Sequence, residues 1–260
     1  MLVIMICRWV NRNDLKLNEH KTEVVLISSK FRDGPSLGYV SIGNEKIPLS
    51  DKAASLGVVL DKQMSFDHHM KHLCKSLVCQ FRNLFKIRKY LNKEPAATFV
   101  YAFITSKLDF CNSLFYGLPN HQLRKLQLLQ NMAARFVSGA RKFDYIRPIL
   151  VKLHCLPISY RVVFKLLLLV FKALHGIGPR YLVELLKCQN HSRTLRSNSL
   201  ERLLQQKSNT KTHGDRAFST CAPRLWNNIP VDIRRSNSVS TFKTEKFYRP
   251  TSLGNLLIMV

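Results

Sequence analysis

Acidic residues are scarce in this chain. Its 260 residues include 41 Lys and Arg but only 16 Asp and Glu, so the formal net charge at pH 7 is +25. Such an excess of one sign costs self-repulsion in the compact state and favours a polyanionic partner. Nucleic acid is the commonest polyanion and an anionic membrane surface is the second, and composition alone does not separate the two.

Paired carboxylates are also missing. Polymerase chemistry needs close carboxylates that hold two divalent metals about 4 Å apart, but the nine aspartates here are scattered and include no adjacent pair. The chain lacks a glycine-rich phosphate loop and any spacing typical of a Ser-His-Asp or Cys-His site. Only Cys188 and His191 have the tight spacing of zinc ligands, and the downstream residues that could form a second arm, His213 and Cys221, are loosely spaced. We therefore expect no catalytic residues, no metal, no cofactor, no small-molecule substrate and no enzymatic activity from this chain alone.

Long hydrophobic runs are absent too. A membrane span needs roughly 20 apolar residues, whereas the most apolar stretch, residues 162–174, contains Lys165 and Lys172 and favours a buried amphipathic helix. The N-terminus lacks the features of a secretory signal. The seven cysteines are odd in number and irregular in spacing. These features predict reduced thiols in a nuclear or cytoplasmic protein with no membrane partner.

Helical periods dominate the chain after Phe66. Apolar residues at three- and four-residue steps predict one helix from Phe66, a second after Asn92 that runs to about Tyr116, and a third from Asn120 to Gly139. Before them, strand-forming runs lie at residues 22–28, 39–47 and 54–60. We predict a mainly α fold with a small N-terminal antiparallel β-sheet, a three-helix bundle and a C-terminal helical region.

The predicted chain begins with a β segment. The bundle follows, then three further parts, and a tail ends the chain. The parts are 1–62 (β segment), 63–140 (bundle), 141–188 (irregular to 157, then helical), 189–215 (polar linker), 216–247 (two short helices) and 248–260 (a tail with no clear role). The bundle core is predicted to contain Leu73, Leu77, Phe81, Phe99, Phe103, Leu126, Leu129 and Phe136.

Basic residues form rows on the predicted helices. Between Met70 and Leu91, Lys and Arg recur and no Asp or Glu occurs. A charge row is usually a solvated helix face, but a row without compensating acids favours a polyanion-binding face. The candidate nucleic-acid contacts are Lys16, Lys21, Lys71, Lys75, Arg82, Lys86, Lys89, Arg124, Arg135, Arg141 and Lys142. Among the interleaved aromatic residues, Tyr90 and Tyr145 are the stacking candidates, whereas most of the phenylalanines, a group that includes Phe143, are expected in the core.

Several segments resemble, in order, the part of jockey-like LINE (non-LTR) retrotransposon reverse transcriptases that follows the catalytic aspartates. They are WVNRNDLKLNEHKTE over residues 9–23, LGVVLD over 56–61 with FDHH over 66–69, TSKLDFCNSLFYGLP over 105–119, LQLLQNMAAR over 126–135, LHCLPI over 153–158, PRYL over 179–182, GDRAF over 214–218, WNNIPVDIR over 226–234 and FK over 242–243. The first eight residues and the tail after residue 247 do not match.

The resemblance implies the distal palm edge with the primer-grip hairpin, then the three-helix thumb, then a region of unclear role. In that family the thumb grips template–primer nucleic acid through its backbone, so the implied partner is RNA, DNA or an RNA–DNA hybrid. The paired aspartates, their magnesium and the endonuclease would lie before residue 1. Three interpretations stay open: a polymerase fragment that contacts nucleic acid, a non-enzymatic host nucleic-acid-binding protein derived from the element, and a non-functional relic.

Overall fold

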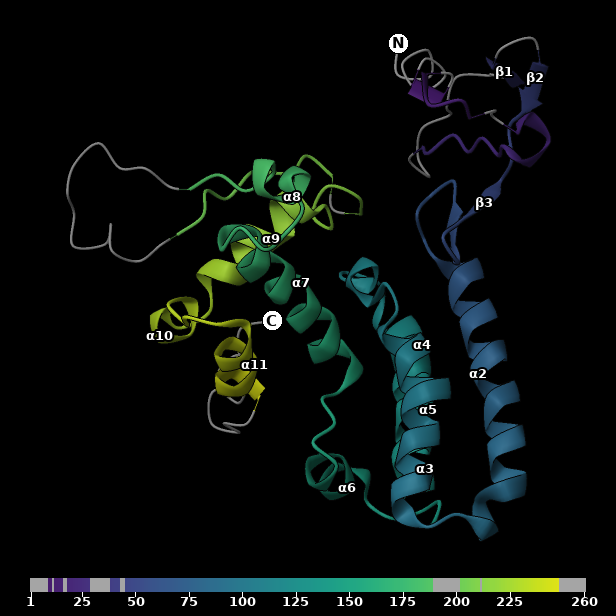
Figure 1. The fold of residues 1–260 in the computed structure, drawn as a ribbon, viewed down its shortest axis with the longest axis vertical. Helices are drawn as coiled ribbons and strands as arrows, with labels where there is room; N and C mark the ends of the chain where they lie inside the picture. Colours follow the sequence, from purple (N-terminus) through teal and green to yellow (C-terminus); the bar gives the residue numbers. More distant parts are fainter. Residues whose placement is uncertain are drawn as a thin grey trace. The chain divides into compact units, whose positions relative to one another are not determined.

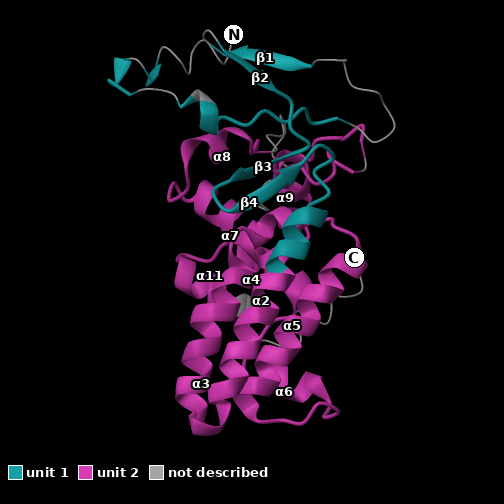
Figure 2. Cartoon of the chain, turned by 90° about the vertical axis from the view of Figure 1, so that its right-hand side faces the viewer, with its two compact units in different colours: residues 1–73 teal, residues 74–260 magenta. Residues whose placement is uncertain are grey.

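A computed structural model describes residues 9–10, 12–15, 18–28, 38–42, 45–188, 202–210 and 212–247. The chain divides into two compact units, residues 1–73 and 74–260, which Figure 2 colours separately. The described residues are mostly helical, with two small antiparallel sheets near the N-terminus. The predicted fold class, mainly α with a small N-terminal β part, is therefore confirmed.

Unit 1 contains two short β-hairpins. Strand β1 (Tyr39–Ile42) pairs with β2 (Glu45–Pro48), and β3 (Lys52–Ser55) pairs with β4 (Val58–Asp61). Between β3 and β4, Leu56 and Gly57 both have positive φ, 47° and 83°, as a tight turn that matches the strand twist requires. Each sheet has only two strands, so both hairpins expose their edges.

The strand expected over residues 22–28 is wrong. Val24 makes only an isolated bridge to Leu49, and Ser28 N donates to the Lys62 carbonyl at 3.0 Å. This segment therefore forms scattered hydrogen bonds in place of a ladder. A short 3-10 helix, η1 (Glu19–Lys21), precedes it.

Asp61 organises the entry to the first long helix. Its carboxylate is buried and accepts hydrogen bonds from Gln63 N at 3.1 Å, Ser65 N at 2.8 Å and Ser65 Oγ at 2.9 Å. Ser65 Oγ in turn accepts from Asp67 N at 3.2 Å, at the start of α2 (Asp67–Ile87). The carboxylate thus satisfies backbone N–H groups that the tight turn before α2 leaves without partners.

The predicted three long helical segments are present. After α2 come η2 (Arg88–Tyr90), α3 (Lys93–Val100), η3 (Tyr101–Thr105), α4 (Ser106–Asp109), η4 (Asn112–Phe115) and α5 (Asn120–Ser138). Helix α3 packs against α5 (Figure 1). Gly139 ends α5 in the left-handed conformation, φ 74°, as the sequence predicted. The buried core of this bundle includes Leu73, Leu77, Phe81, Leu84, Ala96, Val100, Ile104, Leu108, Phe115, Leu126, Leu129, Ala133, Ala134, Phe136 and Val137.

Two expectations about the second helix are wrong. Phe103 is 42% exposed and Phe99 is half-buried, and their rings stack on each other at 6.1 Å. The π-helical turn η3 shifts the register, so that Val100, Ile104 and Leu108 form the buried stripe. The helix also ends at Asp109 and not near Tyr116, because the chain turns at Cys111, φ 51°.

The C-terminal region has a core of its own around α7 (Ile158–Leu174). It includes α8 (Arg180–Glu184), α9 (Phe218–Asn227), α10 (Val231–Arg234) and α11 (Val239–Phe247). Phe171 stacks on Phe242 at 4.5 Å between ring centroids, and Trp226 is buried beside them. Residues 141–157, expected to be irregular, contain α6 (Ile146–Lys152), and residues 217–247 contain three helices where two were expected.

About half of the predicted linker, 189–215, lies outside the described residues. Within the described part, Leu203 is buried and belongs to the C-terminal core. Its backbone N donates to Asn227 Oδ1 at 2.9 Å, and Asn227 Nδ2 donates to its carbonyl at 2.8 Å. Residues 202–210 therefore include a packed segment, which the polar composition did not predict. The predicted tail, 248–260, lies outside the described residues.

Candidate nucleic-acid interface

A row of basic side chains follows one face of α2. Lys71, Lys75, Arg82 and Lys86 are separated by four, seven and four residues. At about 100° per residue these positions fall within about 60° of one another around the helix. All four side chains are exposed, and Lys89 in η2 is exposed as well. We call these five residues the α2 basic row.

The α2 basic row has few acidic neighbours: α2 contains Asp67, four residues before Lys71, and no other Asp or Glu. Ion pairs within the described ranges join Lys62 to Asp51, Arg161 to Asp109 and Arg180 to Glu184, and none includes a member of the row. Positive charges without counter-charges leave an electrostatic potential that attracts an anion. The row therefore has the charge and accessibility that contact with phosphate requires.

The opposite face of α2 fixes the row in place. Leu77, Phe81 and Leu84 are buried, and Phe85 contacts the Phe136 ring edge-on at 5.4 Å. Lys107 Nζ also donates to Ser76 Oγ at 3.0 Å. Since the apolar face packs into the bundle, the basic face points to solvent.

Arg88 holds the end of this helix against α5. Its Nε donates to the Phe136 carbonyl at 2.6 Å, its Nη1 donates to the Leu91 carbonyl at 2.9 Å, and its guanidinium lies 5.4 Å from the Phe136 ring centroid. Arg88 is thus a structural residue. Its neighbour Tyr90 is 76% exposed, with Lys89 Nζ 4.8 Å from its ring centroid.

The turn after α5 places a second basic group. Arg141 and Lys142 are exposed, and Tyr145 is 70% exposed. Phe143 belongs to the group of aromatic residues of which most were expected in the core, and it is 90% exposed. It lies in a turn and not on a helix, so helical spacing gave no valid argument for burial. Its position between Lys142 and Asp144 in a segment without apolar periodicity is the signal that could have found it.

Arg135, a predicted nucleic-acid contact, has a structural role. It is half-buried, and its Nη2 donates to the Asp144 carbonyl at 3.1 Å, while Asp144 Oδ2 accepts from Arg141 N at 2.7 Å. The guanidinium therefore holds the turn and is not free on the surface. Arg124, on the same helix, is exposed.

The remaining candidates belong to unit 1. Lys21 is exposed, and its backbone N donates to Asn18 Oδ1 at 3.2 Å. Lys16 lies outside the described residues.

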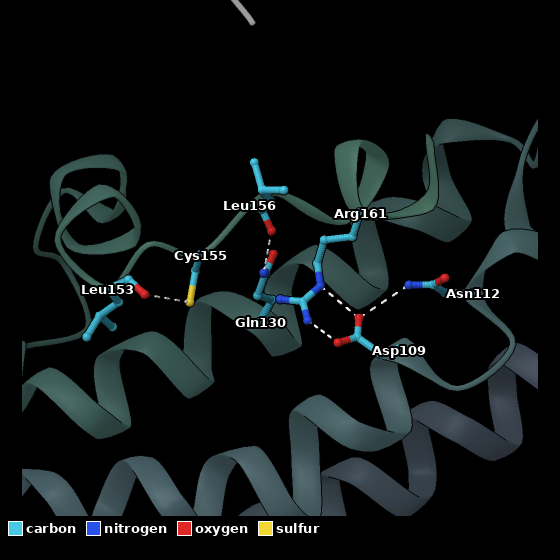
Figure 3. Close-up of polar contacts among 7 residues, drawn as sticks. All are labelled: Asp109, Asn112, Gln130, Leu153, Cys155, Leu156 and Arg161. Atoms are coloured by element: carbon cyan, nitrogen blue, oxygen red, sulfur yellow. Dashed lines mark hydrogen bonds and ion pairs between the residues drawn. The ribbon is translucent and has the colours of Figure 1, made fainter. Parts of the chain in front are cut away.

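A polar network joins the bundle to the C-terminal region (Figure 3). Arg161 of α7 forms a two-pronged ion pair with Asp109 of α4: its Nε donates to Oδ1 at 2.8 Å, and its Nη2 pairs with Oδ2. Asn112 Nδ2 donates to the same carboxylate at 3.2 Å. Gln130 of α5 donates to the Leu156 carbonyl at 2.6 Å. These contacts fix α7 against α4 and α5, and they explain why Asp109 has no free carboxylate for chemistry.

Cys155 lies beside this network. Burial raises the pKa of its thiol, a nearby Arg161 acts in the opposite sense, and Asp109 adds to the increase. The thiol donates to the Leu153 carbonyl at 3.5 Å (Figure 3). A half-buried thiol with a raised pKa is a poor nucleophile.

Arg216, just before α9, connects that segment to the end of η4. Its Nε donates to the Tyr116 carbonyl at 3.0 Å and its Nη2 donates to the Leu114 carbonyl at 3.2 Å. Gly117 has φ 71°, and a Cβ there would lie 2.7 Å from Arg216 Cγ. The arginine therefore packs where only glycine leaves room.

Comparisons with known proteins identify no relative: no family model, no curated protein and no solved structure matches the chain. Across the described ranges, no three His, Cys, Asp or Glu side chains gather as a metal-binding group. No helix in the described part is both long enough and apolar enough to cross a membrane.

Proposed function

We propose that the chain binds the phosphate backbone of double-stranded nucleic acid through the α2 basic row. The observation that carries the proposal is the alignment of exposed, unpaired cations on one face of a helix whose opposite face is buried. Lys and Arg contacts to phosphate carry no base information, so we expect little sequence preference among DNA, RNA and hybrid duplexes.

The length of the row suits a duplex. Fifteen residues separate Lys71 from Lys86, which corresponds to about 22 Å along a helix. A duplex strand advances about 3.4 Å per nucleotide, so the row spans the length of roughly six or seven base pairs. Several phosphates can therefore be contacted at once without bending of the nucleic acid.

We further propose that the chain is part of a LINE-type RNA-directed DNA polymerase and acts as its thumb. The sequence resemblance and the basic row support this independently of each other. The chain supplies binding and no polymerisation chemistry, because the carboxylates that would hold magnesium are not among its scattered aspartates. The proposed partners are template–primer RNA, DNA or their hybrid.

The test replaces Lys75, Arg82, Lys86 and Lys89 together by Gln and measures duplex affinity by fluorescence anisotropy across a salt series. Each lost phosphate contact lowers the slope of log affinity against log salt by about 1. We therefore expect the slope of the quadruple variant to fall by about 3 to 4.

A matched control keeps the total charge the same. Lys187, Arg202, Lys207 and Lys243 are exposed cations of the C-terminal region, and their replacement by Gln removes the same charge. If both quadruple variants change the slope equally, binding depends on net charge alone. If neither changes it, the α2 basic row is only a solvated face. Either result contradicts the proposal.

A further inference from the structure

The end of the bundle formed by η2 and by the turn after α5 gathers exposed aromatic rings and cations. We propose that this end binds unpaired bases of single-stranded nucleic acid by stacking. The inference rests on the proposed function, because it adds a single-stranded site to a chain that contacts duplex through the α2 basic row.

Two segments far apart in the sequence meet at this end. Arg88 donates from η2 to the Phe136 carbonyl at 2.6 Å, and a Cβ built on Gly139 would lie 3.6 Å from Arg88 Nη2. Tyr90 follows Arg88 by two residues, and Phe143 follows Gly139 by four. Figure 1 accordingly shows the α2–α3 and α5–α6 connections at the same end of the bundle.

The rings at this end are unusually open to solvent. Tyr90 is 76% exposed, Phe143 is 90% exposed and Tyr145 is 70% exposed. An exposed Phe ring contributes little to folding, since its apolar surface stays in water. A nucleobase that stacks on it removes that surface from water, and every base offers a π-face.

The turn that carries two of these rings is held in shape before any ligand binds. Arg135 Nη2 donates to the Asp144 carbonyl at 3.1 Å, and Arg141 N donates to Asp144 Oδ2 at 2.7 Å. A fixed turn lowers the entropy cost of binding, because fewer torsions are lost when the ligand stacks.

A cation accompanies each segment. Lys89 Nζ lies 4.8 Å from the Tyr90 ring centroid, and Lys142 Nζ lies 5.6 Å from the Phe143 ring centroid. Rings for bases beside cations for phosphates are what a single strand needs. An anionic membrane surface also attracts cations and aromatic rings, but the usual interfacial element is an amphipathic helix, and residues 139–145 form a turn and not a helix.

The experiment compares three probes on the full chain: an oligothymidylate of about 12 nucleotides, within the usual range of site sizes, an abasic strand of the same length and charge, and a duplex of that length. The test variant carries Tyr90→Ala, Phe143→Ala and Tyr145→Ala. The control variant carries Tyr101→Ala, Phe110→Ala and Tyr181→Ala, which removes three rings that are also at least half exposed. Circular dichroism verifies that both variants keep the native helix content.

We expect the chain to bind the oligothymidylate about 10-fold or more tightly than the abasic strand, given the usual contribution of a stacked base. The test variant should lose that preference and keep its duplex affinity and salt slope, and the control variant should keep all three. The fluorescence of a Phe143→Trp variant should also fall when the oligothymidylate binds; the same titration of the unchanged chain corrects for Trp9, which is 61% exposed, and for the buried Trp226.

Equal affinity for the abasic strand, or no loss in the test variant, overturns the inference. So does binding to anionic vesicles that depends on the same three rings. These failures leave duplex binding intact, whereas failure of the proposed function abolishes the salt-dependent duplex binding itself, so the two are distinguishable.

Discussion

The ion pair between Asp109 and Arg161 offers a direct test of how α7 is held against the bundle. Replacement of Arg161 by Met removes two donors and leaves a half-buried carboxylate with Asn112 Nδ2 as its hydrogen-bond donor in the network of Figure 3. Loss of one partner of a fully buried pair costs about 3–5 kcal/mol. Here the Arg161 side chain is 19% exposed and the Asp109 side chain 36% exposed, so water screens part of the charge and we expect about 2 kcal/mol.

The assay is a double-mutant cycle with Arg161→Met, Asp109→Asn and the double variant, followed by urea unfolding. Each single change leaves one residue without its ion-pair partner, whereas the double change leaves no charge unpaired. The double variant should therefore lose less free energy of unfolding than the sum of the two single variants. We expect a coupling free energy of about 1–2 kcal/mol.

A second pair serves as the control. Arg180 Nε lies 3.1 Å from Glu184 Oε1, and the two side chains are 93% and 65% exposed. Replacement of Arg180 by Met should cost less than about 0.5 kcal/mol, the usual value for an exposed helical pair. If the Asp109–Arg161 cycle proves additive within about 0.5 kcal/mol, the network does not fix α7 to the bundle and the reasoning is refuted.

Three further outcomes are expected. The purified chain should not extend a primer on an RNA template with magnesium, because the paired carboxylates are missing; clear extension products on a sequencing gel would contradict this. In hydrogen exchange, the slow amides should lie in α2 to α5 and the fast ones in the two-stranded hairpins, whose edges are unpaired; slow hairpins would mean a more stable sheet than we describe. Burial raises the pKa of the Cys221 thiol to about 11 from the ordinary value of 9.0, so the unfolded thiol ionises first, and its stabilising contribution, present below pH 9, should be lost between pH 9 and 11. Urea unfolding of Cys221→Ala beside the unchanged chain over that range isolates this contribution, and identical pH dependence of the two would be the contrary result.

The helices were predictable because their signals are local. Gly139 had to end the third helix, since it supplies the left-handed residue that a helix terminus favours, and the apolar steps in α2 identified Leu77 and Phe81 as core. Helical periodicity predicted the wrong buried residues where the backbone departs from the α-helical period. The π-helical turn η3 moved the buried stripe to Val100 and Ile104 and left Phe103 exposed, and no propensity in that segment announces such a turn.

The residues of the candidate site also differ in whether the sequence could predict their roles. The α2 basic row follows from residue spacing on one helix, so its alignment could be read from the sequence. Arg135 could not be distinguished from it, because its partner, the Asp144 carbonyl, lies in a turn whose path the sequence does not specify. Asp109 and Arg161 are 52 residues apart, and only the packing of α7 brings them together.

The sequence blocks that prompted the resemblance therefore have an identifiable physical role. Four residues of these blocks each make a contact that depends on their side-chain shape. The Asp109 carboxylate pairs with a guanidinium, and Gly117 has no Cβ to collide with Arg216. Arg216 donates to two carbonyls, and the Asn227 amide both donates and accepts. No particular side-chain shape is required of the cations in the α2 basic row, because a phosphate accepts a hydrogen bond from Lys or Arg alike. Lys cannot replace Arg161 on the same terms, since a single ammonium does not reach both carboxylate oxygens as a planar guanidinium does. These four residues of the resembling blocks thus hold the frame of the chain, whereas the proposed binding face depends on the position and charge of its side chains and is less specific in sequence.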